Sequence, residues 1–157
     1  MIRVATISDG EMIRALMQSV PGFWDGGWRT DVLERVLHSA DTIAIVHLAG
    51  GRIEGFACAH DVGFRGYLSE LIVSPSLRGS GIGTSLLAEI ERRLAERGCS
   101  LVIADVWPDA EAFYRAQGWS PPPVVLLRKK LGPSMAELPP KDGPPSQATP
   151  SHGFEND

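Results

Sequence analysis

Hydrophobic positions along the chain follow two periodicities, and each periodicity predicts one kind of element. Apolar residues that alternate with polar ones or run together predict strands, which cover Ile2–Ile7, Thr42–Leu48, Arg52–Asp61, Tyr67–Val73, Leu101–Val106 and Val124–Lys130. Apolar residues three and four positions apart predict helices, which follow Ser8 and Thr30, span Ile82–Arg97, and run from Asp109 to Gln117. This order of elements predicts an α/β protein.

Short polar and glycine-containing segments set the limits of these elements. Ser8 and Glu11 have the spacing of a capping box for the first helix, and Pro21-Gly22 ends it. Ala49-Gly50-Gly51 separates two strands and predicts a hairpin. The run Leu101–Val106 is apolar, which is typical of a strand buried on both faces.

Composition narrows the class of protein. The 157 residues are 43% hydrophobic and 22% charged, which is ordinary for one globular domain. No apolar run approaches the length of a transmembrane helix, and the first ten residues lack the pattern of a secretion signal. Cys58 and Cys99 have apolar neighbours and no metal-ligand spacing, so we expect reduced thiols in a cytoplasmic protein and no metal site.

Residues 132–157 differ in composition from the rest of the chain. They contain four carboxylates against one lysine, and six of the twelve prolines. Such a segment has too little apolar surface to offset the entropy of ordering. We therefore predict a folded domain over residues 1–131 and a flexible acidic tail over residues 132–157. Most of the net charge of −4 belongs to the tail, and the domain has no basic stripe for nucleic acid.

The segment Arg78-Gly79-Ser80-Gly81-Ile82-Gly83-Thr84 connects a predicted strand to the helix Ile82–Arg97. Its three glycines leave the backbone bare where the chain enters the helix. The first turn of a helix has unpaired N–H groups and the positive end of the helix dipole, which together attract phosphate. Arg78 adds a guanidinium suited to phosphate oxygens. This pattern predicts a site for a phosphate or pyrophosphate group.

Other interpretations of the glycine segment stay open at this point. It can be a turn that binds nothing. A P-loop requires a lysine, and none occurs between Met1 and Val125. A dinucleotide fingerprint requires glycine or alanine where Thr84 stands, although Asp105 lies about twenty residues farther on, as that fold expects.

Two segments resemble motifs of the GNAT superfamily of acyl-CoA-dependent N-acyltransferases. Leu71–Gly83 is similar to the family's acetyl-CoA-binding segment, with Arg78, Gly81 and Gly83 at the motif positions. Ala112–Trp119 is similar to the family's Phe-Tyr-x-x-x-Gly-Phe/Trp element, at its expected distance. The resemblance covers the whole predicted domain. It implies the GNAT fold, a central mixed and mostly antiparallel sheet with helices on both faces and a splayed strand pair that holds CoA.

The resemblance also implies how acetyl-CoA, the co-substrate, is held. The pantetheine arm would lie along Leu71, Ile72 and Val73. The pyrophosphate would lie on Arg78, Gly79, Ser80, Gly81, Ile82, Gly83 and Thr84. One departure concerns Trp107-Pro108-Asp109, which stands where many members have an asparagine that contacts the cofactor.

Acetyl transfer requires a proton donor for the departing thiolate and a route for the amine proton. By resemblance Tyr114 is the general acid, and the alternative is a tyrosine that only packs. Glu70 is a candidate base, and strand alternation places it on one face with Leu68 and Ile72. His60 is an alternative base, and proton loss through water is a further route.

Trp24 and Trp28, which flank Asp25 in the loop after the first helix, are candidate contacts for the acceptor. Indole rings attract a cationic amine by cation–π interaction, and the carboxylate adds charge. The same loop also suits a mobile lid or ordinary packing. His60, at the end of its strand, is likewise assigned to the acceptor side.

These residues predict an N-acetyltransferase that moves the acetyl group of acetyl-CoA to a primary amine of a small molecule, by direct attack in a ternary complex. Two alternatives stay open: acetylation of a protein N-terminus or lysine, and a non-catalytic acyl-CoA-binding module. Tyr114 favours the enzyme over the module. We expect neither a nucleic-acid nor a membrane partner, and a homodimer is left open.

Overall fold

The computed structural model describes residues 1–132 and builds them around one five-stranded sheet. The strands follow chain order across the sheet and are β1 (Ile2–Val4), β2 (Thr42–Ala49), β3 (Arg52–Asp61), β4 (Gly66–Val73) and β5 (Val102–Ile103). Neighbouring strands are antiparallel except β4 and β5, which are parallel. The predicted mixed, mostly antiparallel sheet is therefore confirmed.

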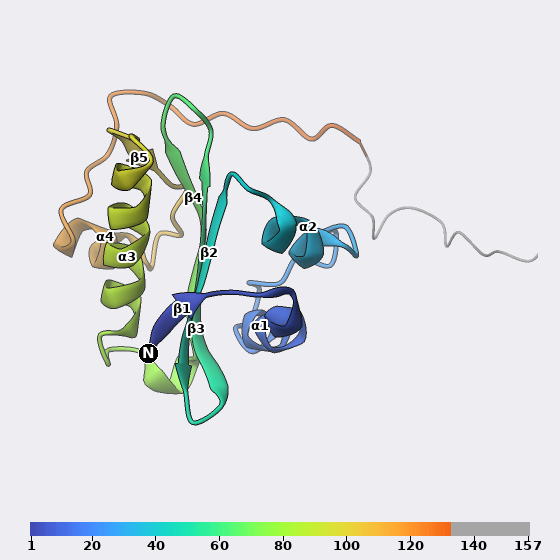
Figure 1. Cartoon of the computed structure of the whole chain (residues 1–157). Helices are drawn as coiled ribbons and strands as arrows, with labels where there is room; N and C mark the ends of the chain where they lie inside the picture. The colour runs from blue at the N-terminus through green and yellow to red at the C-terminus, as the bar shows by residue number, and fades with distance from the viewer. Residues whose placement is uncertain (133–157) are drawn as a thin grey trace, which may run out of the picture.

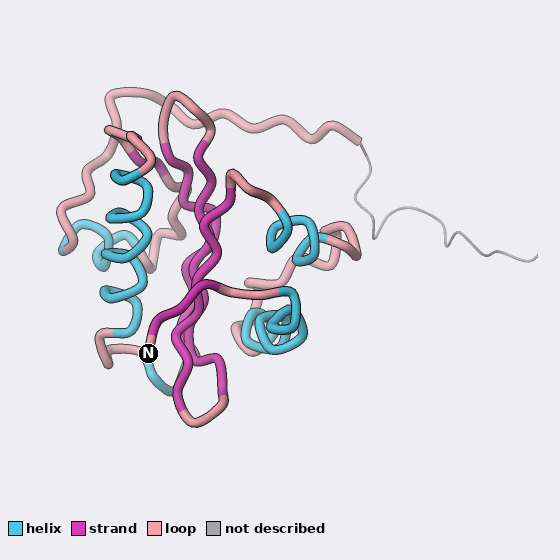
Figure 2. The backbone as a smooth tube through the Cα atoms, viewed as in Figure 1, coloured by secondary structure: helices cyan, strands magenta, loops and turns pink. Residues whose placement is uncertain are grey.

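Helices cover both faces of the sheet, as Figures 1 and 2 show. One face carries α1 (Gly10–Gln18) and α2 (Val32–His38), and the other carries α3 (Ile82–Glu96) and α4 (Glu111–Ala116). Two short 3-10 turns, η1 (Ile7–Asp9) and η2 (Pro75–Leu77), lie before α1 and before α3. The chain passes through α3 between β4 and β5, which is the crossover that a parallel pair requires.

Two hydrophobic cores result, one on each face of the sheet. On the α3 face, Leu86 and Ile90 are fully buried, and they are positions that the helical periodicity singles out. On the α1 face, Ile13 and Met17 pack around Phe56 of β3. Burial of each such side chain contributes about 1.5–3 kcal/mol, so the two cores hold α1 and α3 firmly against the sheet.

A β-bulge in β4 changes which side chains share a face. Cys58 of β3 pairs with Glu70, and the next residue of β3 pairs with Leu68, so Ser69 is an extra residue without a partner. Leu68 therefore packs in the α3 core, whereas Ile72 packs in the α1 core. The prediction that Glu70 shares a face with Leu68 is therefore wrong, whereas the prediction that it shares a face with Ile72 is confirmed.

The start of α1 also differs from the prediction. Thr6 and Asp9, rather than Ser8 and Glu11, form a capping box, and it precedes η1. Asp9 is buried and pairs with Arg3 at 2.7 Å. The Arg3 guanidinium, with the Thr6 N–H, holds the pKa of Asp9 well below its usual range. The chain turns at this carboxylate, which shortens the first strand.

Two strands predicted near the C-terminal end are shortened or wrong. The predicted Leu101–Val106 is a half-buried, two-residue strand, because it lies at the sheet edge with β4 as its partner. Val124–Lys130 forms no strand, and Leu127 is 86% exposed. Figure 1 shows this segment running away from α4 across the end of the sheet. A strand needs a backbone to pair with, and the chain after Pro121-Pro122-Pro123 meets none among the described residues.

The acidic tail predicted for residues 132–157 lies outside the described residues, apart from Gly132. Within residues 1–132, no helix is both long enough and apolar enough to cross a membrane.

Candidate active site

Strands β4 and β5 separate soon after they meet, which leaves one edge of β4 open. Their pairing covers only the first two residues of β4. At the other end, the Ser74 N–H donates to the Glu54 carbonyl at 2.8 Å. By strand alternation, the N–H and C=O groups of Val73 and Leu71 then point away from β3. An extended molecule that carries amide groups can pair with β4 at these two residues.

The glycine segment that follows β4 presents free backbone amides. Gly79 and Gly81 have φ angles of 81° and 86°, left-handed values that favour glycine. Among the described residues, no acceptor pairs with the amides of Gly79, Gly81, Ile82, Gly83 and Thr84. Arg78 is exposed at the same place. Together with the α3 dipole, these groups suit a phosphate or pyrophosphate.

Gly83 connects the glycine segment to the rest of the site. A Cβ at this position would lie 3.5 Å from Cζ of Phe113 in α4 and 3.6 Å from Cγ2 of Val73 in β4. The start of α3, the open edge of β4 and α4 are therefore adjacent to one another.

Tyr114 on α4 has a free hydroxyl group. Its ring lies 5.2 Å from the ring of Phe113 and 5.3 Å from that of Trp119, between centroids. The hydroxyl has no hydrogen-bond partner within residues 1–132. Burial raises the pKa of Tyr114 to about 12, and the charge of Glu70 adds to the increase. The phenol is therefore protonated at neutral pH and can donate to a bound molecule.

Glu70 is a largely buried carboxyl group on the α1 side of β4. Burial and the negative charge of Asp105 raise the pKa of Glu70 to about 7. This pKa is suited to taking up a proton near neutral pH. Asp105 itself accepts a 2.5 Å hydrogen bond from the Tyr67 hydroxyl. From the sequence, Asp105 was weighed only as part of a dinucleotide site. Its position just beyond an apolar strand, which is typical of site residues, was the signal that could have found it.

His60 lies on the same face as Glu70, but both of its ring nitrogens are engaged. Nδ1 is 3.0 Å from Oγ1 of Thr42, and Nε2 is 3.0 Å from Oγ of Ser69. Burial lowers the pKa of His60. The imidazole is thus neutral at neutral pH and has no free nitrogen for an amine.

The loop between α1 and α2 brings aromatic side chains toward the chain that follows β5. Trp24 and Trp28 pack edge-to-face at 5.3 Å, and the Arg14 guanidinium lies 4.7 Å over the Trp24 ring. One face of Trp24 is therefore already occupied by a cation. Phe23 of this loop lies 5.9 Å from Trp107, between ring centroids. The sequence did not assign Trp107 to the acceptor side, because only tertiary structure brings it to the loop.

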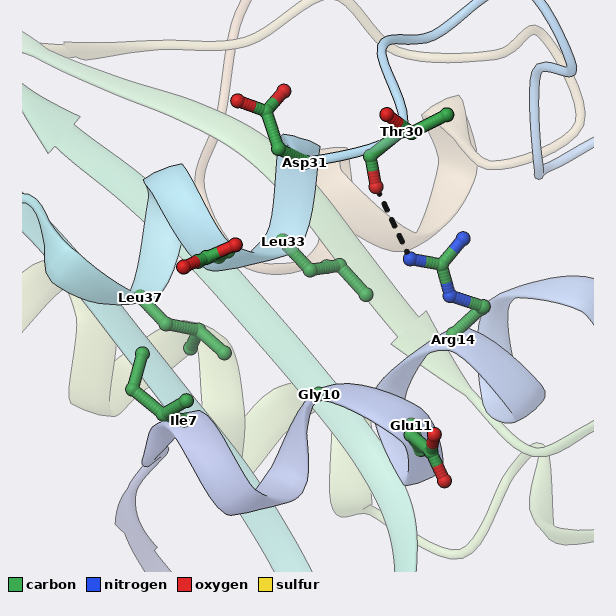
Figure 3. Close-up of a pocket in the computed structure, with 9 residues that line it drawn as sticks. Ile7, Gly10, Glu11, Arg14, Thr30, Asp31, Leu33 and Leu37 are labelled. Atoms are coloured by element: carbon green, nitrogen blue, oxygen red, sulfur yellow. Dashed lines mark hydrogen bonds between the residues drawn. The ribbon is translucent and has the colours of Figure 1, made fainter.

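A shallow pocket of about 260 Å³ lies between α1 and α2 (Figure 3). Its lining includes Glu11, Asp31 and Glu34, and Arg14 reaches across to the Thr30 carbonyl at 3.4 Å. None of the predicted site residues lines it. The candidate site is instead the unpaired edge of β4 together with the glycine segment. Within residues 1–132, no group of three or more His, Cys, Asp and Glu side chains is placed to hold a metal ion.

The sequence matches the acetyltransferase (GNAT) family over residues 11–119. Acetyltransferase plu1384 of Photorhabdus laumondii is 30% identical over 82 residues, which cover 52% of this chain and 57% of that protein. Acetyltransferase SG1711 of Sodalis glossinidius is 29% identical over 105 residues, which cover 64% of this chain and 73% of that protein. The chain thus spans little more than half of the Photorhabdus protein.

A solved structure is similar over most of this chain. It is AAC(6')-Iy in complex with the bisubstrate analogue CoA-S-monomethyl-acetylneamine, which superposes with a TM-score of 0.69 at 25% identity. The match covers 83% of this chain and 97% of that one.

Proposed function

Because the chain belongs to the GNAT family of acetyltransferases, we propose that it transfers the acetyl group of acetyl-CoA to a primary amine of a small molecule. The amine attacks directly in a ternary complex. The observation that carries the proposal is that the free amides before α3, the open edge of β4 and α4 with Tyr114 lie next to one another. These features match the anionic, extended and reactive parts of acetyl-CoA in that order.

When bound, acetyl-CoA supplies an acetyl group activated as a thioester. The amides of Gly79 and of 81–84, with Arg78, would hold its pyrophosphate. The backbone groups of Leu71 and Val73 would pair with the amides of its pantetheine arm. Two fixed attachments along one extended molecule set where the thioester lies, and positioning of this kind lowers the barrier without further chemistry.

Glu70 takes the proton that the attacking amine loses. An alkylammonium has a pKa of about 10.4, so the amine needs a group that accepts its proton at neutral pH. A carboxyl group with a pKa of about 7 is half ionised there. The carboxylate also attracts the cationic form of the amine into the site before the proton is lost.

Tyr114 donates a proton to the sulfur as the carbon–sulfur bond breaks. The charge of Glu70 contributes to the raised pKa of Tyr114. When Glu70 takes up the amine proton it becomes neutral, and Tyr114 becomes a better donor at the step in which the thiolate leaves. The proton held by Glu70 then restores the phenol. An amine that enters as the ammonium ion loses two protons overall. One is released to solvent, and the other moves through Glu70 and Tyr114 to the sulfur, so that the products are the amide and the free thiol.

We place the acceptor beside the loop that carries Trp24 and Trp28, near the Phe23–Trp107 contact. AAC(6')-Iy is named an aminoglycoside N-acetyltransferase, and its complex contains a bisubstrate analogue of CoA and an acetylneamine. This likeness supports a small molecule with a primary amine as the acceptor.

The test is an acceptor screen with acetyl-CoA that reads released thiol and confirms the acetylated product by mass spectrometry. The screen contains polyamines, aminoglycosides, aromatic amines, and peptides with a free N-terminus or lysine. Acetylation of a small amine supports the proposal. Acetylation of peptides alone indicates a protein acetyltransferase. Acetyl-CoA binding without thiol release by any acceptor indicates a binding module, and absence of acetyl-CoA binding overturns the proposal.

A further inference from the structure

His60 and Ser69 tie the bulge of β4 to the neighbouring strand. The Ser69 hydroxyl donates to the Cys58 carbonyl at 3.2 Å, and Nε2 of His60 lies 3.0 Å from the same hydroxyl oxygen. A serine hydroxyl has one proton, so its oxygen accepts from His60 and the imidazole proton is on Nε2. Nδ1 then accepts from the Thr42 hydroxyl at 3.0 Å. These groups form one directed chain of hydrogen bonds across β2, β3 and β4.

The bulge decides which backbone groups lie on the unpaired edge of β4. The Gly66 N–H donates a hydrogen bond of 2.8 Å to the carbonyl of Leu101, the residue just before β5. In a regular strand that starts this way, the backbone N–H and C=O groups of Glu70 and Ile72 would point away from β3, to the unpaired edge. The extra residue shifts the alternation by one position, and Leu71 and Val73 point there instead. The same shift turns the Glu70 side chain from the α3 face to the α1 face.

We propose that His60 is a positioning residue for acetyl transfer, because its Nε2–H holds the bulge that presents Leu71 and Val73 to acetyl-CoA and Glu70 to the amine. The role rests on the function proposed above. It takes the place of a base or an acceptor contact for His60, since both ring nitrogens are engaged within the sheet. The ring also stacks on Tyr67, with centroids 6.4 Å apart and planes 25° apart, which fixes its orientation.

Amide hydrogen exchange, measured by NMR on the full chain, reports whether the bulge is formed and does not depend on catalytic activity. In the wild type, the Ile72 N–H bonds to β3 and exchanges slowly, whereas the Leu71 and Val73 N–H groups have no acceptor in β3 and exchange fast. In His60→Gln, the side-chain amide nitrogen can occupy the position of Nε2 and donate to Ser69. The shorter side chain of His60→Asn cannot reach that position. His60→Gln should keep the wild-type pattern. In His60→Asn and Ser69→Ala, the ratio of the Leu71 exchange rate to the Ile72 exchange rate should fall by about tenfold or more.

Acetyl-CoA affinity, measured by calorimetry, should follow the same order. His60→Asn and Ser69→Ala should bind about tenfold more weakly than the wild type, and His60→Gln should bind nearly as well. Ser19→Ala is the matched control, since it also removes a hydroxyl that donates to a carbonyl, that of Leu16 at 2.6 Å. That bond lies at the end of α1, so the control should bind like the wild type.

Equal behaviour of His60→Gln and His60→Asn in both measurements overturns the proposal. So does a Ser69→Ala protein that keeps both the exchange pattern and the affinity. If His60→Asn does not fold, the comparison of Ser69→Ala with His60→Gln decides in the same way. Failure of the proposed function is distinguishable, because the wild type itself would then either not bind acetyl-CoA or bind it without releasing thiol to any acceptor in the screen.

Discussion

The Tyr67 hydroxyl donates a hydrogen bond of 2.5 Å to Asp105 and joins β4 to the chain after β5, near the point where the two strands separate. Besides burial, the charge of Asp105 raises the pKa of Glu70 to about 7. Asp105, which joins the two strands, therefore also raises the pKa of the carboxyl group that the proposed reaction uses as its base.

Asp105→Asn should move the acidic limb of the kcat/KM profile to lower pH. Removal of the neighbouring negative charge leaves burial as the main cause of the raised pKa of Glu70, so that pKa falls below about 7. The measurement is kcat/KM across the pH range with a confirmed acceptor. Asp109→Asn is the control, because Asp109 is exposed and does not contribute to the pKa of Glu70. An acidic limb that does not move contradicts the coupling.

Glu70→Gln should lower turnover, flatten the acidic limb and leave acetyl-CoA affinity nearly intact. It should also stabilise the fold at alkaline pH. The pKa of Glu70 rises from 4.5 to about 7 on folding, so within this window the folded protein binds more protons than the unfolded chain. Wild-type stability then falls as pH rises through the window. Urea unfolding should find the variant more stable by about 2 kcal/mol near pH 8 and by little near pH 4.

Unchanged turnover in Glu70→Gln would remove Glu70 from the mechanism. Unchanged stability near pH 8 would show instead that its carboxylate is well solvated in the folded protein.

Tyr114→Phe should keep the fold and the acetyl-CoA affinity, because the hydroxyl makes no hydrogen bond within the described residues. Turnover should fall by about 10²–10⁴-fold if proton donation to sulfur is in the slow step. Calorimetry with acetyl-CoA serves as the control for binding. A variant with the wild-type kcat would reduce Tyr114 to a packing residue beside Phe113 and Trp119.

Gly81→Val should abolish most acetyl-CoA binding, because a side chain at this position lies among the free amides before α3. Part of any effect comes from strain, since Gly81 has a φ of 86°. Gly63→Val is the matched control: Gly63 has a φ of 82°, and a Cβ at either position meets nothing within 4 Å. Both variants should lose similar stability, and only Gly81→Val should lose affinity by calorimetry. Equal affinities in the two variants would argue against the pyrophosphate assignment.

The sequence alone determined the features that depend on neighbouring residues. The burial of Leu86 and Ile90 follows from helical periodicity, since one face of a helix must meet the sheet. The free amides of the glycine segment follow from seven consecutive residues, because the glycines and the helix start lie together. The order of strands and helices as far as α4, and with it the fold, was predictable for the same reason.

Only the tertiary structure decided the features that depend on distant partners. The bulge at Ser69 is held by Thr42 and His60 from other strands, so the local pattern predicted a regular β4 and the wrong face for Glu70. Asp105 lies near Glu70 because the chain returns through α3 to pair β5 with β4. A strand likewise exists only where another backbone accepts its hydrogen bonds, which an apolar run such as Val124–Lys130 cannot supply by itself.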